Sequence, residues 1–363
     1  MKKLLFIMPT PNMHLISIIN HHDIRLHYET TIMCWDKVPA WRQSLDWKIP
    51  ENVSYLAFID FFKLPFIISN YDIVMFHGAQ RPFPFQFISL MLASLIKKRV
   101  YLSGEGLRHS YNSVVKFIFK TLLNRNSICY LAIGNNAKDD YFNMGINRWT
   151  YRKFCFAEEY PKLFPVAVPL SKNTGPIRIL TVARLIAYKQ VEMQLEVVSE
   201  YTGSEQLELH IAGSGELMEK LQEKTRELNI THKVIFHGQC DNIKLHDLYL
   251  NATIFILSSN YEGWGVVVNQ AVHYGVPLLI NAAVRSGKNN LVKHGENGFL
   301  FKDKSEMMHY LKILCTNTDI REKFRIKNEE INALWNIEEV SSRLADVFRN
   351  EDVNFIEGPL MKI

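Results

Sequence analysis

The sequence predicts an α/β protein made of two doubly wound, Rossmann-like domains. Short apolar runs, each sized for a buried strand, alternate with helix-like segments along the chain. Such alternation is typical of parallel sheets that are covered by helices on both faces. The 363 residues suffice for two domains of ordinary size. Between Phe156 and Pro176 the alternation breaks at a cluster of Pro, Asn and Gly, which indicates a linker.

The first half reads as one domain, which we place at residues 1–170. Apolar runs predict its strands, and longer segments with helical spacing predict its helices. The expected strands are residues 4–8, 30–35, 54–58, 73–76, 100–102 and 129–133, and the expected helices are 15–20, 83–96, 113–123 and 136–143.

The second domain, placed at residues 171–335, follows the same pattern. Its expected strands are residues 177–182, 207–212, 234–236, 253–257, 278–280 and 299–301, and its expected helices are 192–201, 216–228, 243–250, 266–274, 305–314 and 319–334. A last helix is expected at 337–348. Two such domains are expected to face each other across a cleft, with ligands at the carboxyl ends of the strands.

The composition is that of a globular protein, with 47% hydrophobic and 22% charged residues. Five scattered cysteines show no metal-ligand spacing, so we expect reduced thiols in a cytoplasmic protein. No apolar stretch approaches the roughly 20 residues of a membrane span.

Charge is distributed unevenly between the halves. Residues 1–170 carry 20 Lys and Arg against 12 Asp and Glu, whereas the remainder carries 22 against 25. The basic half includes the apolar segments 87–99 and 113–125, each with a basic end. Two interpretations stay open: contact with an anionic membrane surface, or core helices with a solvated basic face.

The stretch S-S-N-Y-E-G-W-G-V-V-V-N-Q-A-V-H-Y-G (258–275) is central to the prediction of function. It links an apolar strand to a helix through a loop that contains glycine. Free N–H groups and the positive end of the helix dipole attract anions there, and glycine lets a ligand approach the backbone. Glu262 adds a carboxylate that can bind hydroxyl groups. A phosphate beside a polyol suggests a sugar nucleotide, and a plain strand-to-helix turn is the alternative.

The segment E-G-W-G-V-V-V-N-Q-A resembles the signature of glycosyltransferase family 4, whose members are retaining enzymes of the GT-B fold. Glu262 matches the first Glu of that signature, which contacts the donor sugar. Gln270 stands where a second Glu holds the ribose, and an amide can bind hydroxyls without carrying a charge. The resemblance further implies a diphosphate on the loop and first helical turn, formed by Gly263, Trp264, Gly265, Val266 and Val267.

T-V-A-R-L-I-A-Y-K-Q resembles the strand-Arg-loop-Lys motif of the same family. Arg184 and Lys189 would neutralise a leaving diphosphate, so no metal and no other cofactor is expected. Gly213 begins a lone G-x-G before a helix and resembles the glycine turn of the donor domain; a tight turn is the alternative reading.

Two residues of the first domain are candidates for the acceptor side. His77 ends a strand and precedes Gly78, and Glu105 follows the next strand, where many family members have a His. Each therefore lies at the carboxyl end of an expected strand. A structural histidine is the alternative for His77.

The resemblance implies a hexosyl- or N-acetylhexosaminyltransferase of bacterial surface-polysaccharide synthesis, such as lipopolysaccharide or capsule synthesis. The donor would be a UDP-linked sugar and the acceptor a glycan or lipid-linked glycan, with no nucleic acid involved. Residues 336–363 would form a helix that crosses back to the first domain, plus a tail. The enzyme would be cytoplasmic or peripheral on the inner membrane. A sugar-nucleotide epimerase of GT-B architecture and a degenerate, non-catalytic binding subunit remain alternatives.

Overall fold

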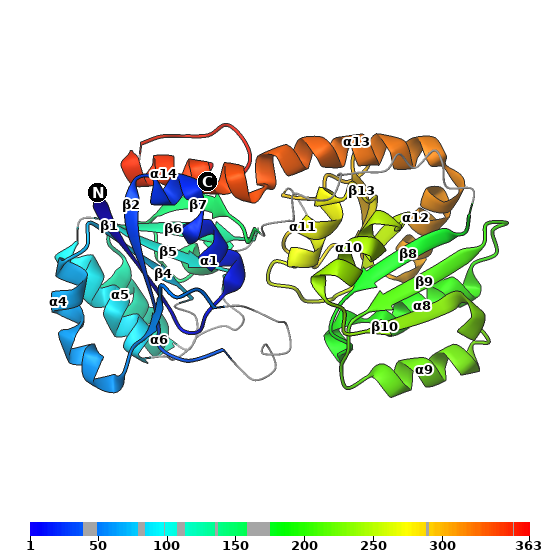
Figure 1. Ribbon diagram of the computed structural model, residues 1–363, viewed down its shortest axis with the longest axis horizontal. Coiled ribbons are helices and arrows are strands. Elements are labelled where there is room, and N and C mark those ends of the chain that lie inside the picture. The colour runs from blue at the N-terminus through cyan, green and yellow to red at the C-terminus, as the bar shows by residue number, and fades with distance from the viewer. Residues whose placement is uncertain are drawn as a thin grey trace. The chain divides into compact units, whose positions relative to one another are not determined.

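The computed structural model describes residues 1–38, 49–78, 84–97, 99–106, 113–134, 137–157, 175–287, 290–350 and 352–363. The chain divides into two compact units, Met1–Glu159 with Leu334–Ile363 and Tyr160–Ala333. Each unit contains one parallel sheet with helices packed on it, so the predicted α/β class with two Rossmann-like sheets is confirmed (Figure 1). The boundary that we expected at residue 170 lies outside the described residues.

The first unit is built on a seven-stranded sheet in the order β3-β2-β1-β4-β5-β6-β7. The strands are β1 (Lys2–Met8), β2 (Tyr28–Cys34), β3 (Val53–Tyr55), β4 (Ile73–His77), β5 (Val100–Gly104), β6 (Ile128–Ile133) and β7 (Thr150–Phe154). Strand β1 pairs with β2 on one side and β4 on the other, so the strand order reverses between β1 and β4. Ligands of open α/β sheets bind at such a reversal.

Helices of the first unit cover this sheet, and the last helix of the chain is among them. They are α1 (Met13–Asn20), α2 (His22–Arg25), η1 (Phe58–Lys63), α4 (Leu64–Ser69), α5 (Pro84–Ile96), α6 (Ser113–Leu123), α7 (Ala137–Phe142) and α14 (Ile337–Arg349). Helix α14 packs against α1 and α2. The chain end then lies along β7, where the Arg152 guanidinium donates to the carbonyls of Leu360 (2.7 Å) and Val353 (2.6 Å).

The second unit is built on a six-stranded sheet in the order β10-β9-β8-β11-β12-β13. Its strands are β8 (Ile177–Val182), β9 (Leu207–Ala212), β10 (Val234–Gly238), β11 (Ile254–Leu257), β12 (Leu278–Asn281) and β13 (Gly298–Phe301). Its helices are η3 (Ala187–Lys189), α8 (Val191–Glu200), α9 (Met218–Glu227), η4 (Thr231–Lys233), α10 (Asn242–Leu250), α11 (Val266–His273), α12 (Lys304–Thr316) and α13 (Thr318–Trp335). The order reverses between β8 and β11, which places the loops after these two strands together.

The two faces of this sheet differ in polarity over β8 and β9. Ile179, Leu209 and Ile211 face the apolar core that α8, α9 and α12 complete. Because side chains alternate along a strand, Arg178 and His210 point to the opposite face, where α10 lies. The face of the sheet toward α10 therefore carries polar side chains, whereas the face toward α8, α9 and α12 is apolar.

Close contact between two backbone segments requires glycine at two positions after β9. A Cβ on Gly213, whose φ is +136°, would lie 1.9 Å from the carbonyl oxygen of Ala183, and one on Gly215 would lie 2.4 Å from that of Leu185. The loops after β8 and β9 also exchange hydrogen bonds, with the Leu185 amide donating to the Ser214 carbonyl at 2.9 Å. Only glycine permits this approach.

We expect Gly213→Ala to lower the free energy of unfolding by about 3 kcal/mol, because the new methyl group would overlap backbone and the φ angle would be strained. Gly295→Ala is the matched control. It has φ +80° with open space around its Cβ position, so it should cost only about 1 kcal/mol. Denaturant unfolding of both variants measures the difference, and equal losses would contradict the steric explanation.

Candidate functional site

Lys189 and Glu262 form an ion pair at the carboxyl ends of β8 and β11. Lys189 ends η3, Glu262 lies in the loop before α11, and the Lys189 Nζ contacts the Glu262 carboxylate. The two side chains are only 10% and 19% exposed. The structure thus brings together two residues that the sequence analysis assigned to different parts of a ligand. Without that ligand, the charges of Lys189 and Glu262 neutralise each other.

A buried hydrogen-bond network positions this pair. The Gln194 amide donates to the Ser258 hydroxyl at 2.8 Å and accepts from the Thr181 hydroxyl at 2.8 Å. The Ser258 hydroxyl in turn lies 2.8 Å from the Lys189 carbonyl. These three side chains are at most 1% exposed. They tie the loop after β8 to the loop after β11, which sets the backbone from which Lys189 extends.

The loop before α11 depends on Gly265. Its φ of +87° is left-handed, and a Cβ there would lie 3.0 Å from the Cγ of Glu262. Any larger residue would therefore press on the carboxylate. Helix α11 then begins at Val266, with no side-chain cap on Gly265 and no acidic residue in the first turn. The amides of Val266 and Val267 open the helix, and the first N–H groups of a helix have no acceptor within it.

Trp264 contributes to the core through its side chain. The indole is 1% exposed, and its Nε1 donates to the Asn269 side chain at 2.7 Å. We had grouped Trp264 with the ligand-binding residues, but its buried side chain leaves only its backbone, like that of Gly263, for a ligand. Its carbonyl accepts a bond from the Ser286 amide at 3.2 Å.

Aromatic residues connect Arg184 to the ion pair. The exposed Arg184 donates to the Tyr188 hydroxyl at 2.9 Å, and the Lys189 Nζ lies 5.4 Å from the centre of the Tyr188 ring. Tyr188 packs edge-on against Tyr261 at 6.3 Å. Both cations therefore contact the same tyrosine, and Lys189 joins this cluster to Glu262.

Arg285 also reaches this cluster, although the sequence analysis missed it. Its guanidinium lies 5.9 Å from the centre of the Tyr261 ring, and Val284 pairs with Glu262 as an isolated bridge. Arg285 follows β12, the neighbour of β11. The rule that pointed to Arg184, a cation just past the carboxyl end of a strand, would have found it.

Gln270 is held by a neighbouring helix. Its side-chain carbonyl accepts from the Tyr249 hydroxyl of α10 at 2.9 Å, and that hydroxyl also lies 3.2 Å from the Val267 carbonyl. The half-buried Gln270 lies one turn from the start of α11. Gly213 lies in the close loop contact described above, which gives it a steric role.

The first unit places its two candidates at the ends of adjacent strands. The His77 Nδ1 lies 3.0 Å from the Ser103 hydroxyl of β5, and its ring lies 6.0 Å from that of Phe156. His14, at the start of α1, packs on the same Phe156 ring at 5.8 Å. Glu105 is half-buried just past β5. These residues lie near the β1/β4 reversal of the sheet.

Across the described ranges of both units, no group of three or more His, Cys, Asp or Glu side chains is arranged to hold a metal ion.

We expect Glu262→Gln to destabilise the protein by about 2 kcal/mol, because the Lys189 ammonium would stay largely buried without its partner. Glu192→Gln is the control, since Glu192 pairs with Lys220 at 3.1 Å on the exposed surface. Such a pair contributes about 0–1 kcal/mol. Thermal or denaturant unfolding distinguishes the two, and a neutral Glu262→Gln would show that the pair carries no stability.

Sequence comparisons find a family model and several curated relatives. Residues 167–330 match the family model of glycosyl transferases group 1. The lipopolysaccharide 1,6-galactosyltransferase of Salmonella typhimurium is 30% identical over 176 residues, 47% of each chain. An uncharacterized glycosyltransferase of Haemophilus influenzae is 30% identical over 169 residues, 45% of this chain and 46% of the relative. The chain thus spans about half the length of these curated relatives.

Solved structures extend the likeness to nearly the whole chain. The apo form of the lipopolysaccharide outer core galactosyltransferase WaaB superimposes with a TM-score of 0.63 at 20% identity, covering 91% of this chain and 99% of WaaB. The structure of Anabaena HepE in complex with UDP and glucose superimposes with a TM-score of 0.70 at 14% identity, covering 96% of this chain and 100% of HepE. The family match thus covers nearly all of the second unit, and the chain has the GT-B fold.

Proposed function

We propose that the protein is a retaining glycosyltransferase that moves a sugar from a UDP-linked donor to a hydroxyl group of a glycan or lipid-linked glycan in surface-polysaccharide synthesis. The observation that carries this proposal is the Lys189–Glu262 pair beside the start of α11. It lies within the matched residues 167–330, and a cation and a carboxylate beside a helix N-terminus suit a sugar diphosphate. The relatives named for lipopolysaccharide galactosyl transfer support the acceptor class.

Positive groups in the cluster suit the leaving diphosphate. Negative charge grows on the diphosphate as the bond to the sugar breaks, so fixed cations and amides stabilise the transition state more than the ground state. Arg184 and Lys189 supply the cations, and the first amides of α11, from Gly265 to Val267, supply N–H donors. We propose that these groups carry the charge without a metal ion.

Glu262 and Gln270 suit the two sugars of the donor. The Glu262 carboxylate accepts hydrogen bonds from hydroxyl groups, and donor binding would replace its contact with Lys189, which frees the ammonium for phosphate. Gln270, held by Tyr249, would bind the ribose through its amide. The retaining stereochemistry is inferred from the resemblance of the Glu262 motif.

On the acceptor side, we propose His77 and Glu105 as the residues that orient or deprotonate the attacking hydroxyl. The contact with Ser103 fixes the orientation of the His77 ring. A general base needs such a fixed geometry before its basicity matters.

Arg184→Ala should lower turnover of the donor by about 100-fold or more, which is the usual cost of removing one group that stabilises developing charge. The fold should persist, since Arg184 is exposed. Arg226→Ala is the control, because Arg226 lies on the exposed face of α9 in a pair with Glu223. Nucleotide release with acceptor present is the measurement. Unchanged turnover would remove Arg184 from the mechanism, and acceptor-independent product would indicate an epimerase.

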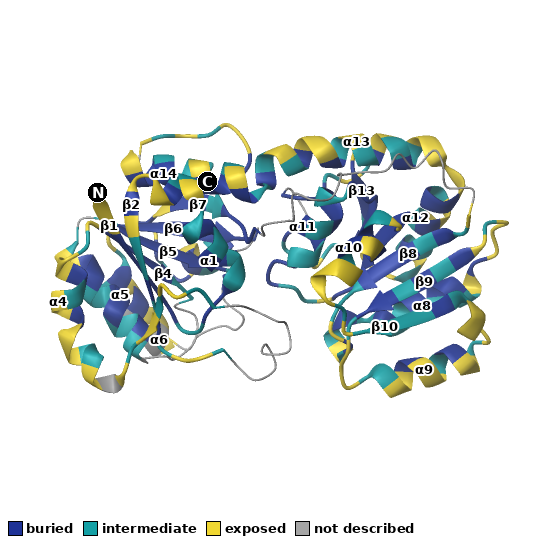
Figure 2. Cartoon of the chain, in the orientation of Figure 1, coloured by how far each residue is buried: buried dark blue, intermediate teal, exposed yellow. Residues whose placement is uncertain are grey.

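We further propose that the first unit docks on an anionic membrane. Large apolar side chains lie exposed on η1 and α4: Ile59 (60%), Phe62 (68%) and Phe66 (72%) (Figure 2). Helix α5 packs on α4, and α6 packs on α5. Phe117 of α6 is 68% exposed. We call Ile59, Phe62, Phe66 and Phe117 the apolar patch.

Basic residues lie on the same helices as the apolar patch. Lys63 is exposed, and so are two lysines of α6, Lys116 and Lys120. A lysine near an anionic surface contributes about 1 kcal/mol. Helix α5, which we had considered for this contact, buries Leu90 and Ala93 in the core and exposes apolar residues only at its end. None of the helices among the described residues is long and apolar enough to cross a bilayer.

Replacing Phe62 and Phe66 by Ser should weaken binding to vesicles that contain phosphatidylglycerol by about tenfold or more, because each ring contributes apolar burial. Co-sedimentation is the measurement. Ile243→Ser, which removes an equally exposed side chain from the second unit, should change nothing. Equal binding of the double variant and the parent protein would refute the docking surface.

A further inference from the structure

The second unit contains a polar hollow between α10 and the sheet. Its volume is about 220 Å³, and its lining includes Arg178, His210 and His237 of the strands and Lys244, Asp247 and Asn251 of α10. A helix and a sheet normally meet through apolar side chains, whereas here both walls also carry polar and charged side chains among apolar ones. Polar lining on two sides indicates a site for water or for a polar ligand.

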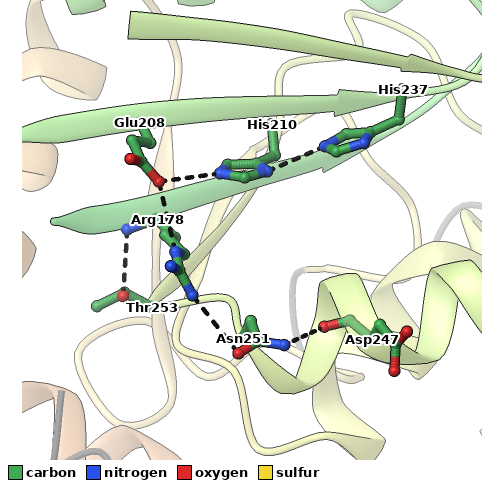
Figure 3. A network of polar contacts seen from close by, with 7 residues as sticks. All are labelled: Arg178, Glu208, His210, His237, Asp247, Asn251 and Thr253. Atoms are coloured by element: carbon green, nitrogen blue, oxygen red, sulfur yellow. Dashed lines mark hydrogen bonds and ion pairs between the residues drawn. The ribbon is translucent and has the colours of Figure 1, made fainter. Parts of the chain in front are cut away.

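The sheet wall contains a fixed pair of imidazoles. The His210 Nδ1 lies 3.0 Å from the His237 Nε2, and the rings stack at 5.2 Å (Figure 3). The other nitrogen of His210 lies 3.3 Å from the Glu208 carboxylate. Because that carboxylate accepts, it selects the His210 tautomer protonated on Nε2, and His210 then accepts from His237. With these two hydrogen bonds made, the Nδ1 of His237 remains as an acceptor.

A β-bulge aims His237 at His210. The pairing of β10 with β9 shifts register between Phe236 and Gly238, so His237 is the extra residue. A bulge redirects one side chain at the cost of ladder pairing, and bulges are frequent next to binding sites. Burial is the main cause that lowers the pKa of His237, and Lys244 and a protonated His210 would lower it further. These effects favour the neutral form of the His237 imidazole.

The helix wall is a regular stripe. Three lining residues follow Lys244 by three, four and seven positions: Asp247, Leu248 and Asn251. At this spacing the four residues share one face of α10. Asn251 connects the two walls, since its side chain accepts from Arg178 at 3.5 Å and donates to the Asp247 carbonyl at 2.8 Å (Figure 3). Lys244 and Asp247 are exposed, so solvent reaches the hollow.

The balance of charge and polarity indicates the class of ligand. Two cations, Arg178 and Lys244, offset two carboxylates, Glu208 and Asp247, so the surroundings favour neither an anion nor a cation. Apolar atoms complete the lining: Leu180, Leu248 and Ala252. The volume lies below the roughly 300–1,000 Å³ of sites for drug-sized ligands. A small, neutral molecule with hydroxyl edges and an apolar face fits these features.

We infer that the hollow is a carbohydrate subsite that takes one neutral hexose unit, separate from the donor site. The Asp247 carboxylate and the His237 imidazole accept from the sugar hydroxyls, and Arg178 and Lys244 donate to them. The residues of the donor site follow the carboxyl ends of β8 and β11, whereas Arg178 and Thr253 lie at their amino ends. The subsite would hold a glycan at a distance from the reacting hydroxyl.

Saturation-transfer NMR of the full chain with the methyl glycosides of glucose, galactose, mannose and N-acetylglucosamine tests this inference. At least one glycoside should bind saturably. Asp247→Ala should weaken that binding by about tenfold, since a hydrogen bond to a charged group is lost. Asp319→Ala, which removes an exposed carboxylate from α13, should leave it unchanged.

His237→Leu is the second variant and should also weaken the glycoside by about tenfold. Glu262→Gln should leave it bound, which separates this hollow from the donor site. Thermal unfolding reports that each variant is folded. The inference is overturned if no glycoside binds, if Asp247→Ala binds as the parent protein does, or if inorganic phosphate displaces the glycoside.

Discussion

The loops after β8 and β11 are joined by buried hydrogen bonds, and the candidate donor site depends on that junction. Thr181, Gln194 and Ser258 lie in the interior of the second unit and bond to one another and to the backbone of Lys189. Each such bond contributes only about 1 kcal/mol net, but leaving one unmade in the interior costs about 1–3 kcal/mol. The network therefore specifies one arrangement of the loops more than it stabilises the fold, and Lys189 meets Glu262 as a consequence.

Three glycines also determine how these loops are arranged. Gly213 and Gly215 let the loop after β9 lie against the backbone of the loop after β8, and Gly265 leaves room for Glu262 while it starts α11. Lys189 and Glu262 are thereby held in contact beside the start of α11. A site for developing charge benefits from groups that are held in place, because groups that are already oriented need no rearrangement during the reaction.

Much of the fold could be predicted from the sequence. Strands β8 and β9 and helix α6 have the predicted bounds, since long apolar or periodic runs specify them. Strand β7 was missed because its sequence, T-Y-R-K-F, carries two cations. One of them, Arg152, is buried because its guanidinium donates to backbone carbonyls near the chain end. The strand 54–58 was predicted too long: β3 ends at Tyr55, and η1 begins at Phe58.

The candidate site was predictable in part. Residues just past the strand ends, such as Lys189 and Glu262, followed from local patterns. The ion pair between them, the aromatic contacts of Tyr188 and the bond from Tyr249 to Gln270 depend on which strands are neighbours, and a single sequence does not show that. The hollow beside α10 was missed for the same reason, because its two walls come from separate strands and a helix.

Hydrogen exchange of the full chain with and without UDP tests the central claim most directly. The account predicts that UDP slows amide exchange in residues 184–190 and 258–270. Unchanged exchange in both segments at saturating UDP, or protection confined to other parts of the chain, would contradict it.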